Sequence, residues 1–443
     1  MEASAIAGVR AAESGEGLIG AIPVSELAAR YGTPQFVYDG EVISARYDLL
    51  RRCLPAEFTI CYSMKANPAQ AIIRRLLEKG AGIEIASAGE FCQAMTAGCP
   101  SQKIIFAGPG KAESELEMVL AHGVGEIHVE SVREAARISA IAVARGITAG
   151  IALRVNPASD AEGGAMRMGG RPSPFGVDEE RIPETLDAIK ELRGLEFRGV
   201  HIFAGTQILS ASTLLSQYRA GLRIARNVAA ALGRPLATVD FGGGLGIPYF
   251  PHDVPLDMEG VRAGVEELMG EARLDPLLCG TRYYVEPGRF LVGEAGVYMT
   301  RINDIKISRG KKYLIVDGGM NHHLAASGNL GQAIKRNFPL VILNRLHAPP
   351  EETVDVVGPL CTPLDILARG IDLPAAEIGD LIGVLQSGAY ARSASPLGFL
   401  SHPTPPEVWV EGGAHRLIRH RGDAAAYWRD QCLDYGEALA GKP

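Results

Sequence analysis

The chain has 443 residues, of which 47% are hydrophobic and 21% charged, so it can bury a large core and is not a disordered protein. This length predicts two domains. The formal net charge of −7 is spread without a basic block, and no apolar run approaches the ~20 residues that cross a bilayer, which argues against nucleic-acid and membrane partners.

The cysteines and the N-terminal segment bear on the compartment. Seven cysteines form neither a CxxC pair nor an even framework, and the sequence starts without a signal-peptide pattern. We therefore expect free thiols in a reducing cytoplasm. The opening segment to about Leu18 is small and polar, and we expect it to be poorly ordered.

From about residue 36 to residue 290, short β-rich runs alternate with amphipathic helical stretches, which indicates a parallel α/β fold. Eight strands are predicted, at 57–62, 82–86, 103–106, 126–130, 150–155, 199–203, 238–241 and 283–286. Eight such units over about 250 residues predict a TIM (β/α)8 barrel. A doubly wound open sheet is the alternative.

After Arg289 the helical periodicity fades and β-rich runs follow, at 301–308, 313–317, 353–357, 380–385 and 407–410. These predict a mostly β C-terminal domain at 291–443, with the barrel at 36–290. We assign the N-terminal segment 1–35 to the β-domain. The run 35–38 fits either domain.

Lys65 follows the first predicted strand of the barrel, in the motif Ser63-Met-Lys-Ala-Asn67. An ammonium in an apolar neighbourhood is costly to desolvate, so we expect its pKa to fall. A neutral lysine amine forms Schiff bases with carbonyl compounds, including pyridoxal phosphate (PLP). A solvated lysine at a strand end is the ordinary alternative.

Two motifs after the last predicted strands form a candidate phosphate site, because TIM barrels often bind phosphate there. The run Asp240-Phe-Gly-Gly-Gly-Leu-Gly246 lets backbone N–H groups approach an anion, and Arg289 offers a charged planar fork. Without a following helix, the glycines do not fit a dinucleotide fingerprint; a tight turn is the structural alternative. Glu286 would keep the pyridine nitrogen of PLP protonated, which favours decarboxylation over racemisation.

Six motifs in chain order resemble the alanine-racemase-fold (fold-type III) PLP decarboxylases, the family of the diaminopimelate and ornithine decarboxylases. They are YSMKAN at 62–67, VHIFAGTQ at 200–207, the glycine loop, EPGR at 286–289, GPLC at 358–361 and GAY at 388–390. The resemblance implies a TIM barrel with a β-domain, and a homodimer with shared active sites.

The resemblance also implies site residues. Cofactor contacts would come from Lys65 as the Schiff-base lysine, Glu84, Phe203, Thr206, Gly243, Gly244, Glu286, Gly288, Arg289 and Tyr390. Cys361, delivered by the partner subunit, would protonate the α-carbon after CO₂ leaves, a role that suits a labile thiol proton. Buried packing is the alternative for Cys361. No metal is expected.

Several residues depart from the family pattern. Phe203 stands where most relatives carry a histidine that stacks on the cofactor ring, and Glu84 replaces a common aspartate of an acidic pair completed by Glu90. His201 fits either a core histidine or a supporting group. Thr362 stands where relatives acting on diamino acids place a carboxylate for the distal ammonium.

The loop 163–176 adds Arg167 and Arg171 before a Phe-Gly turn, and these arginines are candidates for binding a carboxylate or a phosphopantetheine group. This combination resembles the branch with the carrier-protein-linked glutamate decarboxylase of butirosin-type pathways and the exosortase-associated decarboxylases. An ordinary solvated loop is the alternative.

These features predict α-decarboxylation of an amino acid without a distal ammonium, including a glutamyl-type substrate conjugated to a carrier protein. A diaminopimelate-type decarboxylase of free amino acids is the alternative. A racemase on the same fold would need a tyrosine base opposite Lys65, which Cys361 and Glu286 disfavour. A PLP carrier protein would lack the β-domain.

Overall fold

The computed structural model describes residues 8–158, 172–203, 205–250, 252–332 and 335–432, and the backbone of residues 166–167. The chain divides into two compact units. One consists of residues 39–295 and 388–393, and the other of the described parts of 1–38, 296–387 and 394–443. Each unit is described by itself.

The first unit contains a closed ring of eight parallel strands, which confirms the predicted TIM barrel. The strands are β5 (Phe58–Ser63), β6 (Gly82–Ile85), β7 (Ile104–Phe106), β8 (Glu126–Val129), β9 (Ala149–Asn156), β12 (Leu195–Ile202), β14 (Thr238–Asp240) and β15 (Arg282–Val285). Parallel pairing of β15 with β5 closes the ring. All eight overlap the predicted ranges, although β12 begins four residues earlier than predicted, at Leu195 rather than residue 199.

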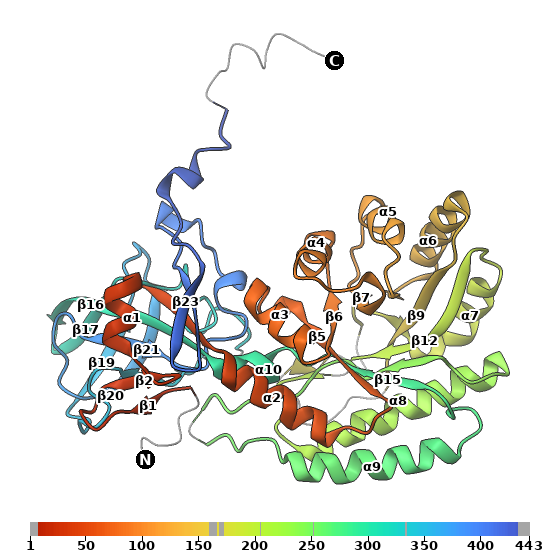
Figure 1. Ribbon diagram of the computed structural model, residues 1–443, viewed down its shortest axis with the longest axis horizontal. Coiled ribbons are helices and arrows are strands. Elements are labelled where there is room, and N and C mark those ends of the chain that lie inside the picture. The colour runs from red at the N-terminus through yellow and green to blue at the C-terminus, as the bar shows by residue number, and fades with distance from the viewer. Residues whose placement is uncertain are drawn as a thin grey trace. The chain divides into compact units, whose positions relative to one another are not determined.

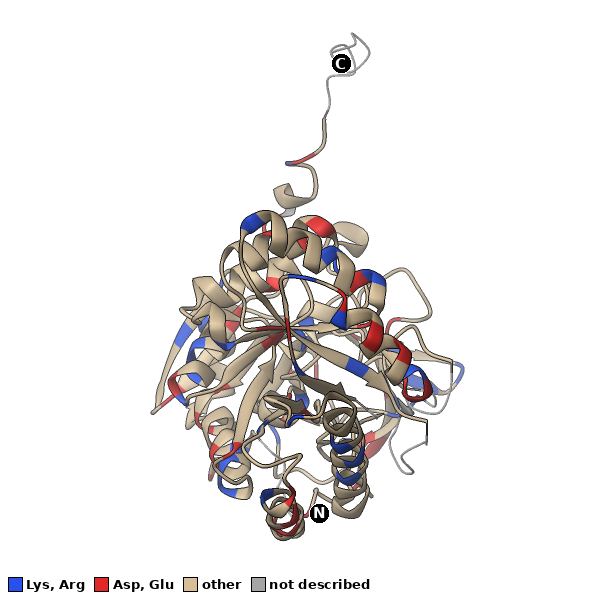
Figure 2. Ribbon diagram, turned by 90° about the vertical axis from the view of Figure 1, so that its right-hand side faces the viewer, with Lys and Arg blue, Asp and Glu red and all other residues tan. Residues whose placement is uncertain are grey.

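Helices flank the strands on the outside of the barrel (Figure 1). They are α2 (Gly40–Cys53), α3 (Gln70–Glu78), α4 (Ala88–Thr96), α5 (Glu113–Ala121), α6 (Val132–Arg145), α7 (Ile182–Lys190), α8 (Ala211–Leu232), α9 (Met258–Leu274) and the short α10 (Arg289–Val292). Ser87, Ser131 and Ser210 cap helix N-termini with their hydroxyls. Many charged residues lie on these helices (Figure 2).

The second unit is mostly β, as predicted. Its large sheet has the order β20-β19-β17-β16-β4-β22-β23, and β21 pairs with both β16 and β18. The strands are β4 (Gln35–Asp39), β16 (Gly296–Ser308), β17 (Lys311–Val316), β18 (Leu340–Ile342), β19 (Glu352–Val357), β20 (Ile366–Leu373), β21 (Leu381–Val384), β22 (Glu407–Glu411) and β23 (Ala414–Arg419). The run 35–38 thus pairs in this sheet rather than in the barrel.

The start of the described chain is ordered, so the expectation of disorder to Leu18 is wrong from residue 8 onward. Strands β1 (Arg10–Ala11), β2 (Gly17–Ile19) and β3 (Ile22–Pro23) form a small antiparallel sheet that leads into α1 (Val24–Tyr31). Apolar side chains of this segment, Val9 and Ile19 among them, pack into the core of the β-rich unit. This packing orders the segment, although its small and polar composition had predicted disorder.

Among the described residues, no helix combines the length and the apolar composition needed to span a membrane.

Candidate active site

Lys65 lies at the C-terminal end of β5, in the short helical turn Met64–Ala66. Its side chain is 50% exposed, and Nζ lies 3.1 Å from Oε2 and 3.3 Å from Oε1 of the buried Glu84. The hydroxyl of Ser63 also donates to Glu84, at 2.5 Å. Strand β6 therefore presents a fixed carboxylate to the lysine amine.

The expected fall in the pKa of Lys65 is wrong for this state of the protein. Burial is the largest single influence and lowers the pKa, but the combined effects of Glu84, Glu286 and Tyr390 outweigh it, and the pKa lies above its ordinary value. The sequence argument counted only desolvation, because it could not place two carboxylates around the amine. In this state Lys65 is an ammonium paired with Glu84.

The glycine run after β14 packs its backbone closely against neighbouring loops. A Cβ on Gly243 would lie 2.6 Å from the carbonyl oxygen of Glu286, and one on Gly244 would lie 3.0 Å from that of Gly205. Gly244 also has a φ of 106°, which other residues adopt only with strain. The run is thus fixed by close approach, and its glycines cannot be replaced without moving the backbone.

Arg289, the first residue of α10, lies between two tyrosines. Its Nη1 donates to the hydroxyl of Tyr249 at 2.8 Å, and its guanidinium carbon lies 4.7 Å from the ring centroid of Tyr390. Its buried Nε has no hydrogen-bond partner in the described part of the chain. Tyr390 belongs to the segment 388–393 of the barrel unit, where its N–H donates to the carbonyl of Ala66 at 2.8 Å.

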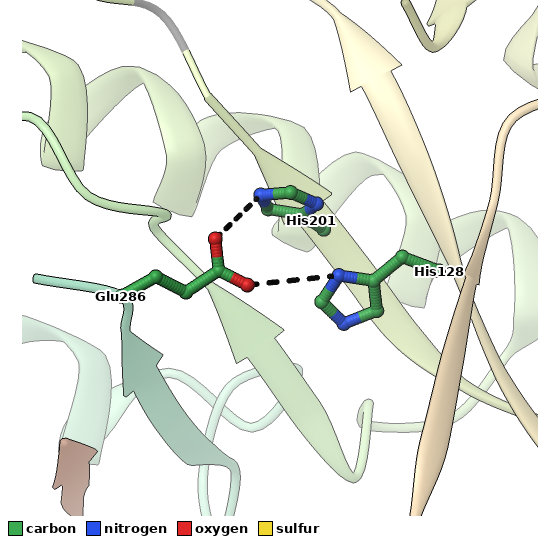
Figure 3. A group of neighbouring side chains, drawn as sticks. All are labelled: His128, His201 and Glu286. Carbon is green, nitrogen blue, oxygen red and sulfur yellow. Dashed lines mark ion pairs between the residues drawn. The ribbon is translucent and has the colours of Figure 1, made fainter. Parts of the chain in front are cut away.

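Glu286 follows β15 and lies inside the barrel with two histidines (Figure 3). Its Oε2 is 3.5 Å from Nε2 of His201, and its Oε1 is 4.0 Å from Nδ1 of His128. Burial, the neighbouring Asp240 and Glu84 raise the pKa of Glu286 well above its usual range, against the opposing effects of His128 and Lys65. His201 is buried as well, and burial lowers its pKa well below the ordinary value.

A second group of buried polar residues supports this arrangement. Nε2 of His128 lies 3.2 Å from Oε1 of Glu126, whose other oxygen accepts from Thr238 at 2.9 Å. Burial raises the pKa of Asp240 to about 7, although the Gly242 N–H and a hydrogen bond with Glu286 lower it. Burial thus raises the pKa of both carboxyl groups, Asp240 and Glu286, inside the barrel.

Other predicted residues lie on the loops of the same barrel. Phe203, just after β12, is half-buried, and a Cβ on Gly242 would lie 2.9 Å from its ring. Thr206, in the short strand β13 (Gly205–Thr206), is half-buried, and Gly288 packs against Ala66 so closely that a Cβ would lie 2.9 Å away. Glu90, in the first turn of α4, accepts the N–H of Ala86 at 2.7 Å and donates its own N–H to Ser87.

The arginine loop is described only in part. The strand β10 (Met166–Arg167) pairs antiparallel with β13, so the backbone of Arg167 lies opposite Gly205. Arg171 lies outside the described residues. At the Phe175-Gly176 turn, which ends the loop, the N–H of Gly176 donates to the carboxylate of Glu130 at 2.8 Å. The pairing brings the Arg167 backbone beside the predicted cofactor residue Thr206.

Cys361 belongs to the β-rich unit, where it is an exposed free thiol on the loop between β19 and β20. The half-buried Thr362 follows it, and its hydroxyl accepts the N–H of Leu364 at 3.3 Å. Asp365 closes the loop from inside: its oxygens accept from the N–H groups of Met320 at 2.7 Å and Leu360 at 2.9 Å. The loop therefore presents a thiol and a hydroxyl.

Comparison with known proteins identifies the family. Residues 41–293, more than half of the chain, match the model of the pyridoxal binding domain of pyridoxal-dependent decarboxylases. The chain belongs to the pyridoxal-dependent decarboxylases. Its cofactor is pyridoxal phosphate and its reaction class is amino-acid decarboxylation, which confirms the resemblance found in the sequence.

Three relatives illustrate the likeness. The chain is 38% identical over 404 residues to the L-glutamyl-[BtrI acyl-carrier protein] decarboxylase of Niallia circulans, covering 90% of this chain and 94% of that protein. It is 35% identical over 420 residues to the diaminopimelate decarboxylase of Methanothermobacter thermautotrophicus, covering 92% and 94%. The crystal structure of the M. jannaschii diaminopimelate decarboxylase with L-lysine matches with a TM-score of 0.89 at 25% identity, covering 98% and 99%.

The residues inside this decarboxylase barrel fit the cofactor. Pyridoxal phosphate needs an amine for its aldehyde, a carboxylate for its pyridine nitrogen and a site for its phosphate. The barrel offers the accessible amine of Lys65, the buried carboxylate of Glu286, and the glycine run beside Arg289. The unpartnered Nε of Arg289 is a further donor for an anion. These features were all present in the predicted motifs.

Sequence reasoning missed the polar residues deeper in the decarboxylase barrel. His128 and Glu126 alternate along β8, so both side chains point to the interior, and Asp240 begins the glycine motif without having been assigned a role. Polar residues two apart in a fully buried strand were the available signal. Tyr249 was also missed, since nothing in the sequence connects it with Arg289.

Proposed function

We propose that this chain holds pyridoxal phosphate through Lys65, Glu286 and the glycine run with Arg289 and Tyr390. The geometry of these residues supports the assignment: the amine of Lys65 is accessible, Glu286 is buried, and Arg289 packs against Tyr390. Glu84, Phe203 and Thr206 complete the set, with Glu84 holding the lysine ammonium in place before the cofactor enters.

When bound, the cofactor accepts the electron pair left at the substrate α-carbon as CO₂ departs. Glu286 would hold a proton at the pyridine nitrogen and so keep that acceptor cationic. Arg289 and the backbone of Gly243 and Gly244 would bind the phosphate. Cys361 would supply the proton that replaces CO₂ at the α-carbon.

The proposed substrate is an amino acid without a distal ammonium, of the glutamyl type and linked to a carrier. The loop 358–365 carries this proposal. Its one acidic residue, Asp365, is 2% exposed and accepts two backbone N–H groups, so its carboxylate is already occupied. Thr362 has no charge, and burying an ammonium beside it unpaired would cost several kcal/mol. The likeness to a carrier-protein glutamyl decarboxylase supports a glutamyl substrate that is linked to a carrier.

The test measures CO₂ release from glutamate, lysine, ornithine, meso-diaminopimelate and a glutamyl thioester, free or on a carrier protein. We expect kcat/KM for the diamino acids to be about 10²- to 10³-fold below that of the best glutamyl substrate. Thr362→Glu should bring kcat/KM for the diamino acids closer to that for the glutamyl substrate. Thr362→Ser, which adds no charge, is the matched control. Turnover of a free diamino acid that equals the best glutamyl substrate would show a diaminopimelate-type decarboxylase.

Arg167 and Arg171 are the proposed contacts for the acidic or phosphorylated part of such a substrate. The pairing of β10 with β13 supports Arg167. Arg167→Gln and Arg171→Gln should each raise KM for the carrier-linked substrate more than for free glutamate. Equal effects on both substrates would remove the arginines from recognition of the conjugate.

We also propose a cytoplasmic homodimer in which each active site combines Lys65 of one chain with Cys361 of the other. Cys361 is an exposed thiol in a different unit from Lys65, and all seven cysteines are free, as expected for a reducing compartment. Mixing Lys65→Ala with Cys361→Ala protein should restore about one quarter of the sites, because random exchange of subunits makes half of the dimers hybrid and each hybrid has one intact site. No recovery under demonstrated exchange would refute shared sites.

A further inference from the structure

His128 lies at the centre of the buried charges beneath Glu286. Its Nδ1 is 4.0 Å from Oε1 of Glu286, and its Nε2 is 3.2 Å from Oε1 of Glu126 and 3.9 Å from Oδ2 of Asp240. The ring is fully buried and its centroid lies 4.4 Å from that of His201. One imidazole therefore faces three carboxyl groups, contributed by β8, β14 and the residue that follows β15.

The hydrogen bond to Glu126 fixes what His128 presents to Glu286. Because Glu126 also accepts from Thr238, its carboxylate is held in position, and it orients the imidazole through an N–H at Nε2. Nδ1 is then the unprotonated nitrogen; it faces Glu286 and has no hydrogen-bond partner in the described part of the chain. It is placed to take up the proton of Glu286, which leaves that carboxylate ionised beside an imidazolium held by Glu126. The imidazole is thus oriented from behind toward the carboxylate that we assign to the cofactor.

The charges around Glu286 differ in which protonation state of its carboxyl group they favour. Burial, Asp240 and Glu84 all favour a protonated Glu286, whereas His128 and Lys65 favour its ionised form. Lys65 is the group that we assign to the cofactor, so its chemistry changes when the cofactor is bound. His128 is the other group that favours ionised Glu286, and the cofactor does not modify it.

We propose that His128 is a positioning residue that keeps Glu286 ionised, so that the proton between Glu286 and the cofactor stays on the pyridine nitrogen. This inference rests on the proposed role of Glu286. The titratable and charged groups around His128 are Lys65, Glu84, Lys111, Glu126, Arg154, His201, Asp240 and Glu286. Lys111 and Arg154 are themselves paired, with Glu134 and Glu130 at 2.7 Å each.

The first experiment compares binding of pyridoxal phosphate with that of an analogue in which carbon replaces the pyridine nitrogen. The apo-protein carries wild-type His128, His128→Asn or His128→Gln; Asn can still place a polar atom toward Glu286, and Gln toward Glu126. We expect the preference for the nitrogen-containing ligand to fall about tenfold in both variants, with overall folding checked by thermal melting. Thr281→Val, which removes a buried hydroxyl bonded to the Leu236 carbonyl at the other end of the barrel, should keep the preference.

Glu286→Gln separates failure of this inference from failure of the proposed site. If Glu286→Gln keeps the wild-type preference, Glu286 does not contact the nitrogen and the proposed site fails. If Glu286→Gln loses the preference while both His128 variants retain it, the site stands and the role of His128 is wrong.

The second experiment reads the proton directly. With ¹⁵N-labelled pyridoxal phosphate bound, the nitrogen resonance of the wild-type protein should be that of a pyridinium, and it should move toward the neutral ring in His128→Gln and in Glu126→Gln. An unchanged resonance in His128→Gln would overturn the proposal. Stoichiometric zinc retained by the cofactor-loaded protein and lost in His128→Asn would also overturn it, since the trio of Figure 3 would then be a metal centre.

Discussion

The raised pKa of the buried Asp240 has a measurable cost for the stability of the apo-protein. Asp240 is fully buried, and burial raises its pKa to about 7 from an ordinary value of 3.8. A carboxyl that holds its proton more tightly when folded stabilises the folded state only in acid. Stability is therefore lost as the pH rises from the unfolded pKa to the folded pKa, and the loss is complete above pH 7.

The magnitude follows from the difference between the two pKa values. About three pKa units correspond to a loss on the order of 4 kcal/mol near pH 8, of which about 1.5 kcal/mol is already present at pH 5. Asp240→Asn removes the titration, while its amide can still accept the Gly242 N–H and donate to Glu286. The variant should therefore gain about 2–3 kcal/mol relative to wild type between pH 5 and pH 8.

The assay is urea unfolding of apo-protein at pH 5 and pH 8, analysed by linear extrapolation. Asp187→Asn on α7 is the matched control, since Asp187 is an exposed carboxylate whose change should shift stability by less than ~0.5 kcal/mol. A stability difference between Asp240→Asn and wild type that is equal at the two pH values, or larger at pH 5, would refute the reasoning.

Three further predictions concern the cofactor and the proton donor. Lys65→Ala should abolish the cofactor that borohydride fixes to the protein, and mass spectrometry that finds the label on another lysine would exclude Lys65. Gly243→Ala should cost roughly 1–3 kcal/mol in unfolding experiments and weaken cofactor binding, because its Cβ would meet the Glu286 carbonyl at 2.6 Å; Gly270→Ala, with open space in α9, is the control and should not destabilise. Cys361→Ala should lower kcat by a factor of roughly 10²–10⁴ and increase transamination of the cofactor, which product analysis detects. An unchanged rate and unchanged products would show that Cys361 has only a packing role.

The barrel could be predicted from the sequence because its signal is local. Each strand is a short apolar run followed by an amphipathic helix, and this alternation repeats from residue 58 to residue 285. Strand β4 shows the opposite case. It carries the same kind of local pattern, yet it pairs with β16, more than 250 residues later, so only the tertiary structure decides its sheet.

The residues of the site that belong to motifs could be predicted from the sequence, but the pKa values of its titratable groups could not. Lys65 and Glu286 are separated by more than 200 residues, and the pKa of each depends on carboxylates contributed by other strands. A sequence gives the residue types without their distances, so it predicted a depressed lysine pKa where the folded protein raises it. His128 and Glu126 lie only two residues apart in β8, so their spacing was visible in the sequence, but their approach to Asp240 and Glu286 was not.

The segment 388–393 belongs to the barrel unit, although the barrel's own strands end at Val285. It attaches through the side chain of Asn67, which donates to the carbonyl of Gly388 at 2.9 Å, and it brings Tyr390 onto Arg289. During synthesis from the N-terminus, the ring of strands can therefore close long before Tyr390 leaves the ribosome. A chain terminated near Ala295 would hold the lysine and the glycine run but lack the tyrosine, so full assembly of the cofactor pocket waits until translation is nearly complete.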